Sequence, residues 1–105
     1  MSKDKLININ VEDYINFPWT TNHCTIWGRR ITSYNRDTQT FGGEFFRSLE
    51  AVSVRPGDVL QLGIKSQYKQ SHNRKDFFLV DADYNLERVT RGHAAGIVSS
   101  ATEEA

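Results

Sequence analysis

The chain has 105 residues and a mass of 12.0 kDa, so we expect a single domain over residues 1–105, with a polar tail from about residue 99. Its 13 basic and 13 acidic residues cancel, which argues against a protein that binds polyanions through net charge alone. No apolar run approaches the roughly 18 residues of a membrane span, so we expect no membrane contact.

The amino-terminal sequence and the cysteine content point to a compartment. The segment MSKDKLININ contains no apolar block of the length found in signal peptides. The one cysteine, Cys24, has no partner for an internal disulfide and fits a reducing environment. We therefore expect a cytoplasmic protein in which Cys24 is a small, buried structural side chain.

Charge is unevenly distributed along the chain. Residues 27–75 carry nine basic and four acidic residues, a net +5, whereas residues 1–26 carry a net −1 and residues 76–105 a net −4. Because the field near a surface depends on nearby charges, a neutral total is compatible with a basic face. The alternative is that the three segments interleave on folding and neutralise one another.

The beginning of the chain predicts an edge strand followed by a helical turn. Ile7, Ile9 and Val11 alternate with asparagine, which is typical of a half-buried strand. A helical turn is expected to open at Asn10 and to end before Pro18, because the residue before a proline disfavours the α conformation. The edge strand could also pair with a strand of a partner.

A hairpin is predicted next. Residues 23–34 and 39–46 are rich in β-branched and aromatic side chains, and residues 35–38 (NRDT) supply turn formers between them. Alternation fails near Gly28, where we expect a bulge.

The middle of the chain predicts a tight turn and two strands. Residues 55–58 (RPGD) favour a type II turn, because proline presets the second position and glycine accepts a positive φ at the third. In residues 60–68 the apolar side chains fall on one face, so this strand should have one wet side, formed by Gln61, Lys65 and Gln67. Residues 76–80 are apolar on both faces and predict a central strand.

The end of the chain predicts a turn at residues 81–85, a short strand at residues 86–89 and a marginal helix that opens at Thr90. The apolar stripe of this helix is formed by Ala94, Ala95, Ile97 and Val98. These elements together predict a mainly β fold: a small antiparallel barrel or half-barrel of five to six strands with a short C-terminal helix.

Catalytic and metal-binding patterns are weak. His23 and Cys24 are adjacent, so on a strand they point to opposite faces and cannot form a nucleophile and base pair. The histidines and the cysteine lack the spacing of zinc ligands. Asp81 and Asp83 flank a turn, where aspartate accepts backbone hydrogen bonds. We therefore expect no catalytic residue, no metal, no cofactor and no enzyme activity.

Basic and aromatic residues recur together on the predicted strands and their ends. This candidate binding set comprises Trp27, Arg29, Arg30, Tyr34, Arg36, Lys65, Tyr68, Lys69, Arg74 and Lys75. Of its aromatic members, Trp27, Tyr34 and Tyr68 are expected at the surface, because their polar groups tolerate partial exposure. The phenylalanines Phe45, Phe77 and Phe78 are expected in the core.

The sequence therefore predicts a small non-enzymatic binding or regulatory domain that contacts a macromolecular partner through a basic-aromatic face. A protein partner is the first expectation, because tryptophan, tyrosine and arginine dominate protein interfaces. The alternative is a single-stranded nucleic-acid-binding protein, in which bases stack on the aromatic rings and cations follow the phosphates. Homo-oligomers are a further option, since the basic middle and acidic end could pair between copies.

Overall fold

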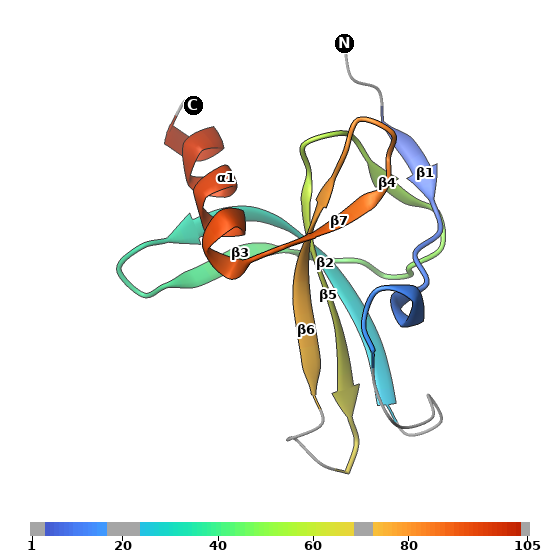
Figure 1. The fold of residues 1–105 in the computed structure, drawn as a ribbon. Coiled ribbons are helices and arrows are strands. Elements are labelled where there is room, and N and C mark those ends of the chain that lie inside the picture. Colours follow the sequence, from blue (N-terminus) through green and yellow to red (C-terminus); the bar gives the residue numbers. More distant parts are fainter. Residues whose placement is uncertain (1–3, 17–23, 69–72, 104–105) are drawn as a thin grey trace.

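The computed structural model describes residues 4–16, 24–68 and 73–103. In this part of the chain seven strands, one 3-10 helix and one α-helix form (Figure 1). Their bounds are β1 (Lys5–Ile7), η1 (Val11–Asp13), β2 (Cys24–Asn35), β3 (Thr40–Phe45), β4 (Val52–Val54), β5 (Val59–Ser66), β6 (Arg74–Val80), β7 (Leu86–Val89) and α1 (Arg91–Glu103). The prediction of a mainly β chain with a short C-terminal helix is confirmed.

The strands form two antiparallel sheets. A two-stranded sheet pairs β1 with β4, and a five-stranded sheet has the order β3-β2-β5-β6-β7. The antiparallel prediction is confirmed, but the described strands do not close into a barrel. Strands β3 and β7 remain the outer edges of the larger sheet, because no other described strand pairs with either edge.

A different segment packs against each face of the five-stranded sheet, and one of the two faces is covered only in part. On one face β1, β4 and the segment around η1 bury a core that contains Leu60, Leu62 and Phe78. On the other face α1 packs through Ala94 and Val98. The central strand β5 is therefore buried along its first six residues.

The prediction that the strand over residues 60–68 has a wet side is correct only toward its end, where Lys65 and Gln67 are exposed. Gln61, which we expected at the surface, is only 3% exposed. Sequence alternation indicated one apolar face correctly, but it could not show that Arg29 of the neighbouring strand β2 contacts Gln61 on the other face. Strand β6 lies beside β5 as an inner strand, and both Phe77 and Phe78 are buried as predicted.

The amino-terminal strand is shorter than predicted. It ends at Ile7, although Ile9 and Val11 are buried as their alternation indicated. Beyond Ile7 the chain bends because the N–H of Ile9 donates to the carbonyl of Leu49 at 2.8 Å, and η1 then begins at Val11. The predicted helical turn is thus present as one 3-10 turn, while Pro18 lies outside the described residues.

The predicted hairpin forms, but its irregularity lies elsewhere. Asn35 closes the turn by accepting the N–H groups of Asp37 at 2.9 Å and Thr38 at 3.3 Å. The register between β2 and β3 shifts between Ile31 and Ser33 rather than at Gly28. Gly28 pairs regularly across β2 and β5, so the prediction of a bulge there is wrong.

Two further features were missed or misplaced by the sequence analysis. Strand β4 was not predicted, because three residues are too few to show a period. Phe45, which was expected in the core, is 64% exposed. It adjoins the half-buried Phe46, and consecutive strand residues point to opposite faces, so only one of the pair reaches the core.

The predicted turn and helix cap at the end of the chain are confirmed. The carboxylate of Asp81 accepts the N–H groups of Asp83 and Asn85, both at 2.9 Å. The hydroxyl of Thr90 accepts the N–H of His93 at 3.1 Å and so caps α1. Among the described residues no helix has both the length and the apolar character needed to cross a bilayer.

The turn at residues 55–58 also has its predicted geometry. Gly57 has a φ of +95°, which the third position of a type II turn requires. The N–H of Asp58 donates to the carbonyl of Arg55 at 3.1 Å and closes the turn. This turn delivers the chain from β4 into the central strand.

We expect Gly57→Ala to lower the free energy of unfolding by about 1 kcal/mol, measured by urea denaturation. An added Cβ would meet nothing within 4 Å, so the loss would come from backbone strain alone. Gly92→Ala is the matched control, because its Cβ also meets nothing within 4 Å and its backbone has no positive φ. Equal losses in both variants would contradict the type II assignment.

Candidate binding face on the five-stranded sheet

The face that carries α1 is covered only in part. In β2 the side chains of Trp27, Arg29 and Ile31 share this face, since alternate residues of a strand point the same way. The helix packs against Ile31 and Val59, near the hairpin. Strands β2, β5 and β6 continue well past α1, as Figure 1 shows below the helix. No described segment covers this extension, which we call the open face.

The open face holds a groove of about 480 Å³, within the usual size range of ligand sites. It is lined by Trp27, Arg29, Phe45, Gln61, Ile64, Lys65, Asn73, Arg74 and Lys75. The charged lining residues are all cations. The groove thus combines positive charge, two aromatic rings and two amides.

The two aromatic rings lie next to each other. The rings of Trp27 and Phe45 are 5.7 Å apart with an interplanar angle of 63°, an edge-to-face contact. Trp27 lies opposite Gly63 across β2 and β5, and its indole covers that glycine so closely that an added Cβ would overlap it. Phe45 lies opposite Arg29 and stays 64% exposed at the edge of the sheet.

Arg29 is held in place between the ring of Phe45 and the central strand. Its Nε donates to Oε1 of Gln61 at 2.6 Å, and its guanidinium carbon lies 5.5 Å from the centre of the Phe45 ring. Burial lowers the pKa of Arg29, because desolvation disfavours the charged form. Arginine nevertheless remains protonated at neutral pH, so the groove contains a fixed and partly desolvated cation.

Arg29 differs from three other arginines that form ion pairs with carboxylates. Asp58 lies 3.9 Å from Arg30, Asp4 lies 3.7 Å from Arg55, and Asp76 lies 3.3 Å from Arg88. Arg29 has a neutral amide as its partner, and no described carboxylate forms an ion pair with it. The same holds for Lys65, Arg74 and Lys75 within the described chain. The positive charge of the open face is therefore not neutralised by the described residues.

Of the nine members of the predicted binding set that the structure describes, five are brought together here and four are not. Trp27, Arg29, Lys65, Arg74 and Lys75 line the groove. Arg30 lies on the opposite face, where it donates to the carbonyl of Ser53 in β4. Tyr34 packs beside Phe41 at 4.7 Å, close to α1 rather than at an open surface.

Two further described members of the set, Arg36 and Tyr68, are not among the residues that line the groove. Arg36 is exposed in the hairpin turn, and Tyr68 is 74% exposed beyond the end of β5. Lys69 lies outside the described residues.

Four groove residues were not in the predicted set: Phe45, Gln61, Ile64 and Asn73. The signal for Phe45 was present in the sequence, since a hairpin closed at residues 35–38 brings residues 39–46 beside residues 23–34. Counting that register requires the position of the bulge, and the bulge was placed wrongly. Gln61 was recognised as polar on a strand, but its contact with Arg29 depends on the pairing of β2 with β5.

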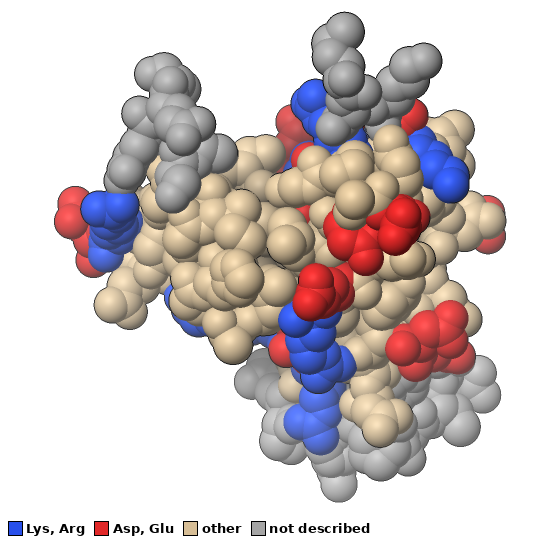
Figure 2. Space-filling view, turned by 45° about the horizontal axis from the view of Figure 1, so that its top comes forward, with Lys and Arg blue, Asp and Glu red and all other residues tan. Residues whose placement is uncertain are grey.

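The rest of the surface shows mixed charge. A second cavity of about 590 Å³ lies between β3 and β4, and its lining carries both signs, from Arg30 and Arg47 to Glu44 and Glu50. Figure 2 likewise shows acidic and basic side chains interspersed around a broad uncharged area. Within the described residues no three of the His, Cys, Asp and Glu side chains gather where they could hold a metal ion.

We expect Gly63→Ala to displace Trp27 and to lower the free energy of unfolding by about 1–3 kcal/mol, as other overpacking changes do. In a Trp27→Ala background the same substitution should have a much smaller effect, because the overlapping ring is gone. Urea denaturation of the wild type, both single variants and the double variant measures this coupling. Additive effects would show that Trp27 does not rest on Gly63.

No protein-family model, curated protein or solved structure matches this chain. The chemistry of the open face is therefore the basis on which a function can be inferred.

Proposed function

We propose that the protein is a small, non-enzymatic binding domain whose open face contacts a macromolecular partner, and that this partner is single-stranded nucleic acid. The observation that carries the proposal is Arg29. It is partly desolvated, is fixed by the neutral Gln61, and lies against the exposed ring of Phe45. The guanidinium of Arg29 has no anionic partner among the described residues. A backbone phosphate next to a base stacked on Phe45 would be such a partner.

Each part of the groove has a role in such binding. Exposed aromatic rings stack with bases of any sequence, and cations follow the backbone phosphates. Phe45 and Trp27 provide the rings, while Arg29, Lys65 and Lys75 provide cations from strands β2, β5 and β6. The amide of Asn73 lines the same groove, and amides can hydrogen-bond to base edges.

A single strand fits this surface better than a duplex. The bases of a duplex are stacked on one another, so they cannot also stack on Phe45 and Trp27. A duplex would interact with the cations only. Single strands present unstacked bases and phosphates together, which matches the mixture of rings and cations in the groove.

A protein partner is the second candidate, and the pair of Trp27 and Arg29 favours it. Both residue types dominate the energetic centres of protein interfaces. Such a partner would carry carboxylates opposite the uncompensated cations, and the domain would then act as a regulator. Neither nucleic-acid binding nor regulation of a protein partner requires a cofactor. Both roles fit the expected cytoplasmic location, which is based on the single cysteine. A second copy of the chain could also supply the carboxylates.

The test is fluorescence anisotropy with labelled single-stranded DNA and RNA at about 50 and 200 mM salt. We expect micromolar or tighter binding that weakens steeply as salt increases. Arg29→Gln should weaken binding to every sequence and reduce the salt slope by about 0.7 for a lost phosphate contact on a single strand.

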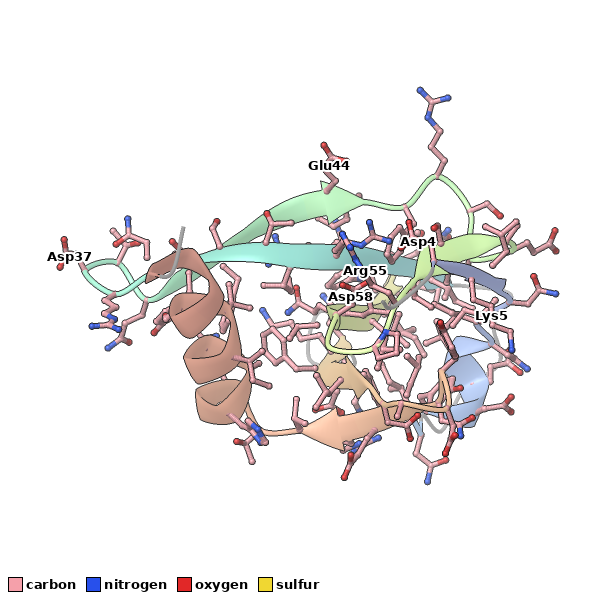
Figure 3. All side chains as sticks on the ribbon, turned by 90° about the horizontal axis from the view of Figure 1, so that it is seen from above. Asp4, Lys5, Asp37, Glu44, Arg55 and Asp58 are labelled. Atoms are coloured by element: carbon pink, nitrogen blue, oxygen red, sulfur yellow. The ribbon has the colours of Figure 1, made fainter. Side chains whose placement is uncertain are left out.

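Arg55→Gln is the matched control, because it removes the same charge at a distant place. Arg55 lies beside Asp4 and Asp58 in Figure 3, and its Nε is 3.7 Å from the carboxylate of Asp4. This variant should bind like the wild type. Equal losses in both variants would show that only total charge matters. Absence of binding at low salt would exclude nucleic acid and leave the acidic protein partner.

A further inference from the structure

The groove residues are ordered in rows that cross the strands. The register places Phe45, Arg29 and Gln61 side by side on β3, β2 and β5. The next row along the strands holds Trp27, Gly63 and Lys75 on β2, β5 and β6. An aromatic ring thus begins each row, and the cation Lys75 ends the second.

The two rows define a small patch. Neighbouring strands lie about 4.8 Å apart, so the path from Phe45 on β3 to Lys75 on β6 crosses about 14 Å. The rows themselves lie about 7 Å apart along the strands. The helix closes the side beyond the first row, because Ile31 and Val59, two residues further along, pack against Ala94 and Val98.

From these dimensions we infer that the open face binds a short single-stranded tract of at most about four nucleotides, which runs across the strands from Phe45 toward Lys75. This inference rests on the proposed function. A stacked strand advances about 3.4 Å per nucleotide, so about 14 Å accommodates four stacked nucleotides and fewer extended ones.

One nucleotide is bound by the pair of Phe45 and Arg29. Phe45 offers its exposed ring to a base at the edge of the sheet. Arg29 uses its Nε for Gln61, and no described group accepts a hydrogen bond from its terminal nitrogens, which leaves them for the adjoining phosphate. Further phosphates would approach Lys75 and Lys65 at the other side of the groove.

The first experiment varies the length of the ligand. The full chain is titrated with labelled thymidine oligomers from the dinucleotide to the decanucleotide at constant salt. The affinity should rise steeply up to the tetranucleotide, and beyond it only by the few-fold statistical gain from overlapping sites. A tenfold or larger rise between hexanucleotide and decanucleotide would overturn the short site but keep the proposed function. If no oligomer binds, the proposed function fails.

The second experiment separates the base from the phosphate. Phe45→Ala should weaken binding of the tetranucleotide by about 5- to 150-fold, the usual loss for one stacked base, and should leave binding of an abasic tetramer unchanged. Arg29→Gln should weaken both ligands by a similar factor. Equal penalties of Phe45→Ala on the two ligands would overturn the stacking assignment.

Leu6→Ala is the matched control for Phe45→Ala. Leu6 is 66% exposed, close to the 64% of Phe45, and it lies on β1 in the other sheet. It should not change the affinity for either ligand. Circular dichroism of all variants checks that each one folds, and a Trp19→Phe background leaves Trp27 as the sole tryptophan whose quenching reports stacking beside Phe45.

Discussion

The register between β2 and β5 gives two adjacent arginines opposite roles. Arg29 lies across from Gln61 on the open face, and Arg30 lies across from Leu60 on the face toward the two-stranded sheet. There Arg30 donates to a carbonyl of β4 and helps to join the two sheets. A slip of one residue would exchange them, because it reverses the face of every side chain in the strand. The open face exists only in the observed register.

The side chains of the open face have fixed positions because the face is built on β5, whose first six residues are buried. Strand β5 contributes Gln61 and Gly63 from a run of six buried residues, so neither can move far. Gln61 fixes Arg29 by a hydrogen bond, and Gly63 leaves room for the Trp27 ring. Partial burial of Arg29 without a carboxylate is unfavourable for the isolated domain, and the anionic ligand that we propose would offset that cost. Stability and binding therefore place opposite demands on this position.

Much of the fold could be predicted from the sequence, and the omissions have physical causes. Local signals identified the hairpin, the turn after Arg55 and the cap at Thr90, because each depends on residues close in the chain. Burial of Gln61 and exposure of Phe45 depend on which distant segment lies across from them, and periodicity carries no such information. The basic and aromatic residues in the sequence indicated that a binding face exists. Only the strand pairing shows that Arg29 lies on this face and Arg30 on the opposite one.

The irregularity between Ile31 and Ser33 divides the hairpin into two parts. Before it in β2, up to Ile31, pairing with β5 sets the positions of Trp27 and Arg29. After it, from Ser33 to the hairpin turn, β2 pairs only with β3 among the described strands. A bulge absorbs an extra residue by bending the strand locally. Changes in chain length at the hairpin tip, where Asp37 projects far from the two-stranded sheet in Figure 3, are therefore buffered before they reach the rings and cations. We therefore expect that a tag or a second domain inserted at the tip would leave the proposed binding site on the open face unchanged.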